Sequence, residues 1–254
     1  MIFNKDLNLF RMNVFSQNGE DGVLKEILKR LGLNNELEVC EFGAADGVWY
    51  SNTFNLVKND KVKLAVYIEK NKQEFQKLEQ LSMQYKTVLP INSEIKFKDN
   101  SSNTLDDILS KTNISLDFDI LSIDIDSYDL DVWRSIKKYK PKIIIIECGR
   151  QNYGEFSEHS SDFKLNSFSS TFNAFKETHE LIFYSGNSFF LDKSFFKNKV
   201  DLEKNFIIDD YKNFLLHRLY YNFSNHSKIK KKLLKYLTPF FLKIIINLSD
   251  YLKK

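Results

Sequence analysis

The sequence has few of the residues that build disulfide frameworks or zinc sites, and it has no long apolar run. Among 254 residues there are two cysteines, Cys40 and Cys148, each inside an apolar segment, and four scattered histidines. Without a CxxC motif or clustered histidines, a structural zinc site is not expected. No run reaches the ~20 apolar residues of a membrane-spanning helix. With no signal peptide recognised ahead of the cysteines, we expect a protein of the reducing cytoplasm.

Charges of the two signs nearly balance, which argues against nucleic acid as a partner. The 37 basic and 34 acidic residues leave a formal net charge of +3, and lysine outnumbers arginine, the better residue for bidentate phosphate binding. The basic surplus lies in residues 228–254, where eight lysines flank apolar side chains. Such a segment suits a helix docked on the domain or on a second subunit, or an interfacial helix at the inner face of the membrane. Pro239 divides it, which favours docking on protein.

Length and composition bound the domain organisation. A chain with 43% hydrophobic and 28% charged residues can bury one sizeable core, which excludes a disordered tail protein, a collagen and a disulfide scaffold. We expect a domain over residues 1–199 with an N-terminal helical cap, followed by a basic helical extension over residues 200–254. Residues 151–168 are polar and aromatic without a period, which predicts a long loop or lid.

Apolar runs alternate with amphipathic segments, and this pattern predicts an α/β fold with helices on both faces of a parallel sheet. The expected strands cover residues 38–42, 63–69, 87–91, 119–126 and 143–147. The expected helices cover residues 20–31, 51–58, 72–83, 104–109, 130–139 and 169–178. Residues 180–184 and 188–191 flank a Ser-Gly-Asn turn, which predicts an antiparallel hairpin added to the sheet edge and seven strands in all.

Acidic side chains follow several of these strands, and ligands of open parallel sheets bind at the carboxyl ends of the strands. The six acids are Glu41, Asp46, Glu69, Asp124, Asp126 and Glu147. So many like charges cannot all stay ionised without cations nearby. Lys70 or Arg150 could supply part of that charge, and a cationic ligand, with or without a divalent metal, would supply the rest. Ser122, Asp124 and Asp126 alternate along the expected strand and so share one face, where unpaired burial would be costly.

Two glycines and one acid point to a nucleoside. Gly43 and Gly47 let the backbone approach a ligand closely, and Glu69, 26 residues after Gly43, is placed to accept both hydroxyls of a ribose. The spacing is not GxGxxG, so a pyrophosphate-binding loop is poorly supported. Taken alone, residues 43–47 could be a tight turn after a strand; with Glu69, a nucleoside cofactor is favoured.

Six motifs in order carry a family resemblance. They are FSQNGEDG at 15–22, EFGAADGVWYSNT at 41–53, YIEKN at 67–71, LSIDID at 121–126, IIIIE at 143–147 and NSFFLDK at 187–193. Together they resemble class I S-adenosylmethionine-dependent methyltransferases, specifically the FkbM-like group of bacterial surface-glycan and natural-product clusters. The resemblance implies a Rossmann-like fold and a cytoplasmic O-methyltransferase that acts on a sugar or sugar-nucleotide hydroxyl for a capsular or other surface polysaccharide.

The resemblance also implies roles for individual residues. Cofactor-binding residues would be Gln17, Glu20, Asp21, Glu41, Gly43, Ala44, Asp46, Gly47, Asn52, Thr53, Glu69 and Asp124. Among these, Glu69 would hold the ribose, and the residues of the first motif would close over the cofactor. Asp124 is the expected base or metal ligand, with Asp126 and Glu147 beside it and Mg²⁺ as the candidate metal. His159 is a second candidate base, against the alternative that it is a solvated loop residue.

Other interpretations remain open at this point. Asp124 and Asp126 could cap the following helix while Glu147 pairs with Arg150. The sequence has Ser127-Tyr128 where related sequences often have a glycine, which leaves the local turn undetermined. A nicotinamide-dependent sugar-modifying enzyme is disfavoured because no tyrosine is followed by lysine four positions later. A non-catalytic adaptor that uses the basic C-terminal segment to recruit glycan-assembly machinery is the third interpretation.

Overall fold

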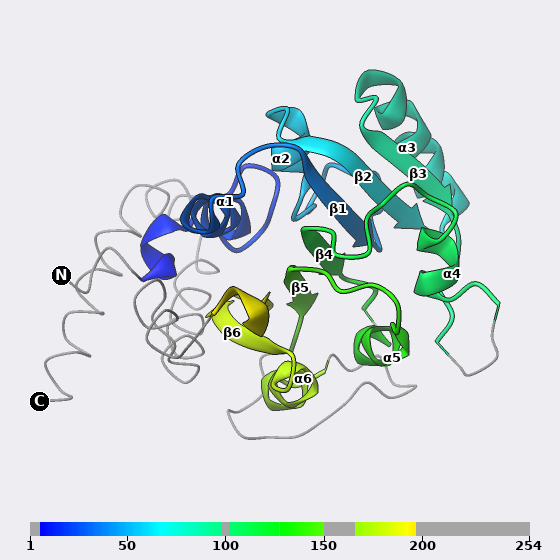
Figure 1. Cartoon of the computed structure of the whole chain (residues 1–254). Coiled ribbons are helices and arrows are strands. Elements are labelled where there is room, and N and C mark those ends of the chain that lie inside the picture. The colour runs from blue at the N-terminus through cyan, green and yellow to red at the C-terminus, as the bar shows by residue number, and fades with distance from the viewer. Residues whose placement is uncertain (1–5, 98–101, 127, 150–165, 197–254) are drawn as a thin grey trace, which may run out of the picture.

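A computed structural model describes residues 6–97, 102–126, 128–149 and 166–196 (Figure 1). The expected extension at 200–254, candidate base His159 and nearly all of the expected lid at 151–168 lie outside the described residues. Within the described part of the chain, no helix is long and apolar enough to span a bilayer.

Seven strands form one mixed sheet. They are β1 (Leu37–Phe42), β2 (Val62–Glu69), β3 (Val88–Asn92), β4 (Ile120–Ile123), β5 (Ile143–Glu147), β6 (His179–Tyr184) and β7 (Asn187–Asp192). Their order is β3-β2-β1-β4-β5-β7-β6. Strands β1 to β5 run parallel, and β7 is antiparallel to both β5 and β6. This arrangement confirms the expected Rossmann-like class I methyltransferase fold, and the strand order reverses between β1 and β4.

Helices cover both faces of the sheet, as expected. They are α1 (Glu20–Leu31), α2 (Phe54–Lys58), α3 (Lys72–Gln84), α4 (Leu105–Leu109), α5 (Asp129–Ser135) and α6 (Phe168–Phe175). There are also two 3₁₀ turns, η2 (Leu7–Phe10) and η3 (Lys193–Phe195), which pack on the same face as α1 through Leu7 and Phe195. Apolar side chains of α1, α2 and α3 pack on one sheet face, and those of α4, α5 and α6 pack on the other. Two separate cores result.

Local signals in the sequence explain where several helices begin and end. Helix α1 carries Glu20 and Asp21 in its first turn, where the helix dipole favours them. It ends at Gly32, whose φ of 73° lets its N–H reach the carbonyls of the last turn. Helix α4 begins with a capping box in which Thr104 and Asp107 exchange hydrogen bonds.

Several expected boundaries differ from those of the structure, and hydrogen bonds to Glu41 explain one of them. Helix α2 begins at Phe54 rather than 51 because the three preceding residues are bound by the carboxylate of Glu41. Strand β4 ends at Ile123, so Asp126 lies beyond it, exposed and at a φ of 55°. The expected sharing of a strand face by Asp124 and Asp126 is therefore incorrect. Helix α5 stops at Ser135 instead of 139.

Gly43 and Gly47, which were expected to let the backbone approach a ligand, lie close to other atoms of the protein. At Gly43, whose φ is 73°, an added Cβ would lie 1.7 Å from the carbonyl oxygen of Asp124. At Gly47, whose φ is 77°, it would lie 2.6 Å from Leu78 of α3. These glycines let the loop after β1 pack against the residue that follows β4 and against α3, so their contact with a cofactor stays a prediction.

Gly43 and Gly32 form a matched pair for testing this contact, because both have a φ of 73° and only Gly43 has atoms near its missing Cβ. Gly32→Ala adds left-handed strain alone, and we expect it to lower the free energy of unfolding by about 1–2 kcal/mol. Gly43→Ala adds a backbone clash as well, and we expect a loss of ~3 kcal/mol or more. Urea unfolding measures both. Equal losses would contradict the close approach to Asp124.

Candidate functional site

A cavity of about 360 Å³ opens at the carboxyl edge of the sheet. Its described lining residues are Gln17, Asn18, Tyr50, Asn52, Asp124, Glu147, Cys148, Gly186 and Asn187. They come from the segment before α1, the loop after β1, the ends of β4 and β5, and the turn into β7. The cavity therefore lies on the side of the strand-order reversal that the fold predicts for a ligand.

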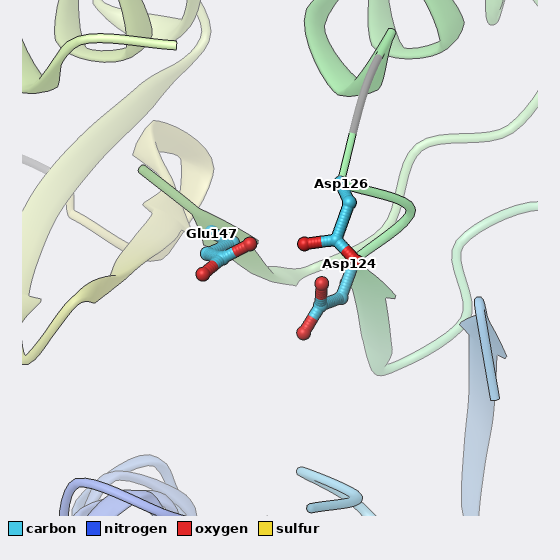
Figure 2. Close-up of side chains that lie close together, drawn as sticks. All are labelled: Asp124, Asp126 and Glu147. Atoms are coloured by element: carbon cyan, nitrogen blue, oxygen red, sulfur yellow. The ribbon is translucent and has the colours of Figure 1, made fainter. Parts of the chain in front are cut away.

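Three carboxylates gather at this edge. Ligand oxygens of Asp124, Asp126 and Glu147 all lie within 4.8 Å of one another. Figure 2 shows the three side chains converging, with Glu147 at the end of β5 and the two aspartates after β4. Asp124 and Glu147 are partly buried, whereas Asp126 is exposed. Three of the six acids expected in one crevice therefore lie together, and their expected role as metal ligands stays a prediction.

Burial and neighbouring acids act together on Asp124. Desolvation raises its pKa well above the ordinary value, and the charges of Glu147, Asp129, Asp126 and Glu41 raise it further. A carboxylate held in this way is a stronger base than an exposed aspartate, and it also gains by binding a cation. The set is made of carboxylate oxygens, the donors that Mg²⁺ prefers, so the three residues fit such an ion.

The side chain of Glu41 binds the loop after β1. Its buried carboxylate accepts hydrogen bonds from the Ser51 hydroxyl (2.9 Å) and from the backbone N–H groups of Asn52 (3.1 Å) and Thr53 (3.2 Å). Burial raises the pKa of Glu41, and these hydrogen bonds oppose that rise. Glu41 does not line the cavity among the described residues. It holds the backbone of Asn52, which is one of the lining residues.

Two further acids bind backbone around residues 43–49. The Glu69 carboxylate accepts from the N–H groups of Ala45 (2.8 Å) and Asn71 (2.6 Å). Asp46 accepts from the N–H groups of Val48 and Trp49, both at 2.9 Å. Each carboxylate oxygen of Glu69 accepts one hydrogen bond, from Ala45 or from Asn71, so each oxygen keeps a further lone pair. Binding of a ribose by Glu69 stays a prediction.

The segment before α1 contributes to the cavity through Gln17, and its acids support that segment. Asp21 accepts from the N–H groups of residues 14–16 at 2.8–2.9 Å. Glu20 accepts from the Asn18 N–H (2.6 Å), the Ser185 hydroxyl (3.2 Å) and the Asn187 amide (3.1 Å). Both carboxylates therefore accept hydrogen bonds from protein donors. Their expected contact with a cofactor stays a prediction.

Sequence reasoning gave no role to Asn187, which lines the cavity. It is the first residue of β7 and lies directly opposite Glu147 in the β5–β7 register. A polar residue that opens the second strand of a hairpin beside an acid-ended strand was the available signal.

Comparisons with known proteins give fold-level likenesses. No family model and no curated protein sequence matches this chain. An S-adenosylmethionine-dependent methyltransferase from Aquifex aeolicus is 14% identical over 66% of this chain and 86% of its own, with a TM-score of 0.41. M. capricolum TrmK in complex with S-adenosylhomocysteine is 14% identical over 89% and 95%, with a TM-score of 0.42. The N-terminal domain of EvdMO1 with S-adenosylhomocysteine bound is 10% identical over 69% and 80%, with a TM-score of 0.44. Likenesses of this strength leave the reaction and the substrate open.

The raised pKa of Asp124 predicts a pH-dependent gain from neutralising it. Because the folded state holds the Asp124 proton more tightly, ionisation costs stability as the pH rises from 3.8, the ordinary value, through the raised folded pKa. We expect Asp124→Asn to raise the melting temperature at pH 7 by ~2–4 °C for each kcal/mol of repulsion removed, and the gain to fade below pH ~4.

Thermal melts of the two proteins between pH 4 and 8, in buffer with EDTA, check this expectation. Asp126→Asn is the matched control, since Asp126 is exposed and should shift the melting temperature much less. A lower melting temperature for Asp124→Asn at pH 7 would contradict the assigned electrostatics.

Proposed function

We propose that this protein is an S-adenosylmethionine-dependent O-methyltransferase that acts on a hydroxyl of a sugar or sugar nucleotide used in surface polysaccharide synthesis. One observation carries the methyl-transfer part. The cavity at the carboxyl edge is lined by Asp124 and Glu147, and no Lys, Arg or His lines it among the described residues. Such a cavity favours a cationic ligand, and a sulfonium cofactor brings that charge. The sugar acceptor is proposed on the motif resemblance.

The placement of the site residues supports an assignment of subsites along the sheet edge. Glu69 ends β2, Asp124 follows β4, and Glu147 ends β5. In the proposed arrangement Glu69 binds the ribose, and the sulfonium lies near Asp124. The acceptor then lies toward Glu147 and the start of β7. The loop at residues 43–47, which Glu69 holds through Ala45, borders the cofactor.

The chemistry asked of the protein is modest. The acceptor oxygen attacks the methyl carbon, the carbon–sulfur bond breaks, and the sulfonium becomes a neutral thioether. The protein must align the oxygen with that bond and accept the hydroxyl proton. Asp124 is the proposed base, since its raised pKa strengthens its hold on a proton. Loss of the positive charge also removes the cation that offset the acids, which favours product release.

A divalent cation is compatible with the same residues. Asp124, Asp126 and Glu147 would hold Mg²⁺, and the ion would lower the pKa of a bound acceptor hydroxyl. In that case Asp124 would serve mainly to orient the acceptor. The proposed location is cytoplasmic, with residues 228–254 docked on protein or against the inner face of the membrane.

Isothermal titration with S-adenosylhomocysteine, S-adenosylmethionine and NAD tests the cofactor. We expect the first two to bind and NAD not to bind. Asp124→Asn should keep S-adenosylhomocysteine affinity within about threefold, yet lower methyl transfer to a panel of sugar nucleotides by about 100-fold or more. Binding of NAD alone would favour a nicotinamide enzyme, and binding of none would favour an adaptor. Normal turnover by Asp124→Asn would remove Asp124 as the base.

A separate assay decides the metal. If Mg²⁺ is required, EDTA should abolish methyl transfer and added Mg²⁺ should restore it, with Asp126→Asn raising the Mg²⁺ concentration needed. Undiminished turnover in EDTA would show that the three acids act without a metal.

A further inference from the structure

The amide of Asn187 is held in one orientation. Asn187 is 9% exposed and lines the cavity opposite Glu147. Its Nδ2 donates to Glu20 Oε1 at 3.1 Å and to Asn52 Oδ1 at 3.5 Å. Asn52 in turn donates from its own Nδ2 to the Ser122 hydroxyl at 3.1 Å. Both amide N–H groups of Asn187 are therefore directed at acceptors of the protein.

Glu20 fixes the orientation of the Asn187 amide. Its side chain is fully buried and accepts three hydrogen bonds from protein donors. A carboxylate can only accept, so the nitrogen of Asn187 must face Glu20 and the oxygen must face away. That Oδ1 atom is buried and has no hydrogen-bond partner among the described residues. A buried acceptor without a donor is costly, and a ligand that supplies one removes the cost.

We propose that Asn187 is a ligand-binding residue of the cavity, whose Oδ1 accepts a hydrogen bond from an N–H or O–H group of the bound molecule. Glu20 is the positioning residue that keeps the oxygen, rather than the nitrogen, toward that molecule. Asp124 and Glu147 line the same cavity, so the group bound here donates hydrogen bonds. An ammonium or a hydroxyl fits, and a phosphate does not.

This inference rests on the proposed function, which offers two sources for the donor. One is the α-ammonium group of the cofactor. The other is a hydroxyl of the acceptor next to the one that is methylated. Asn187 lies at the β5–β7 end of the cavity, and Asp124 lies between it and Glu69 along the sheet edge. This position favours the hydroxyl of the methyl acceptor as the donor. The experiment below distinguishes this hydroxyl from the α-ammonium group.

A pair of substitutions tests the role of Glu20 as a positioning residue. Glu20→Gln introduces an amide that can donate to Asn187, which lets the Asn187 side chain turn and present its N–H₂ group to the cavity. Adding Asn187→Asp restores an acceptor, because a carboxylate can accept from the introduced amide and still face an oxygen to the ligand. A merely structural role of Glu20 would not be rescued by this second change.

The readouts are titration with S-adenosylhomocysteine, titration with its analogue lacking the α-amino group, and kcat/KM with the sugar-nucleotide acceptor. If the ammonium is the donor, wild type should prefer S-adenosylhomocysteine over the analogue by about 10- to 100-fold. Glu20→Gln should lose that preference, and Glu20→Gln with Asn187→Asp should regain it. If a hydroxyl of the sugar-nucleotide substrate donates the hydrogen bond, the affinity for S-adenosylhomocysteine should stay constant in all variants. In that case Glu20→Gln should lower kcat/KM by a similar factor, and adding Asn187→Asp should restore it through a lower KM.

Glu26→Gln is the matched control, since Glu26 also lies on α1 and pairs with Arg30 away from the cavity; it should change neither readout. The proposal is overturned if Glu20→Gln alters neither readout, or if Asn187→Asp restores neither in a protein that melts cooperatively. Failure of wild type to bind S-adenosylhomocysteine would overturn the proposed function instead. In that event, hydrogen exchange of the Asn187 side-chain amide still tests the orientation of the amide. Both of its protons should exchange slowly in the free protein, and fast exchange would contradict the proposed orientation.

Discussion

Buried carboxylates need donors or cations, and this requirement organises the carboxyl edge of the sheet. Glu41 and Glu69 each accept backbone N–H groups from neighbouring loops, and Glu20 does the same from the segment before α1. The loops are fixed to the strand ends through these acids. Asp124 and Glu147 line the cavity instead. The acids at this edge are thus divided between those that bind the loops and those that line the cavity.

The fold was predictable because its signals are local. Runs such as residues 143–146 are apolar throughout and mark buried parallel strands, and the cap of α4 can be read from Thr104 and Asp107. Strand ends were less predictable. Ile125 continues the alternation of β4 in the sequence, but its N–H is bonded to the Asp129 side chain, a tertiary contact that no period encodes.

The sequence identified the acids near the strand ends, but it could not show which of them bind loop N–H groups and which line the cavity. Sequence position places Glu41 and Glu147 alike, each at the end of a parallel strand. Whether a strand-end carboxylate meets loop N–H groups or a cavity depends on the loop conformation. The same holds for Gly47, which is required by Leu78 of α3, a contact between segments far apart in the sequence. Asn187 was missed because its role follows from pairing with β5 and from Glu20.

The walls of the cavity come from opposite ends of the described chain: Gln17 and Asn18 precede α1, whereas Gly186 and Asn187 lie in the hairpin that closes the sheet. Arg11 ties the two together by donating to the carbonyls of Asn18 and Tyr184. During synthesis the pocket cannot be complete until the hairpin has left the ribosome. A cofactor that binds there would select chains that have finished folding and, by mass action, would protect both ends from unfolding at once.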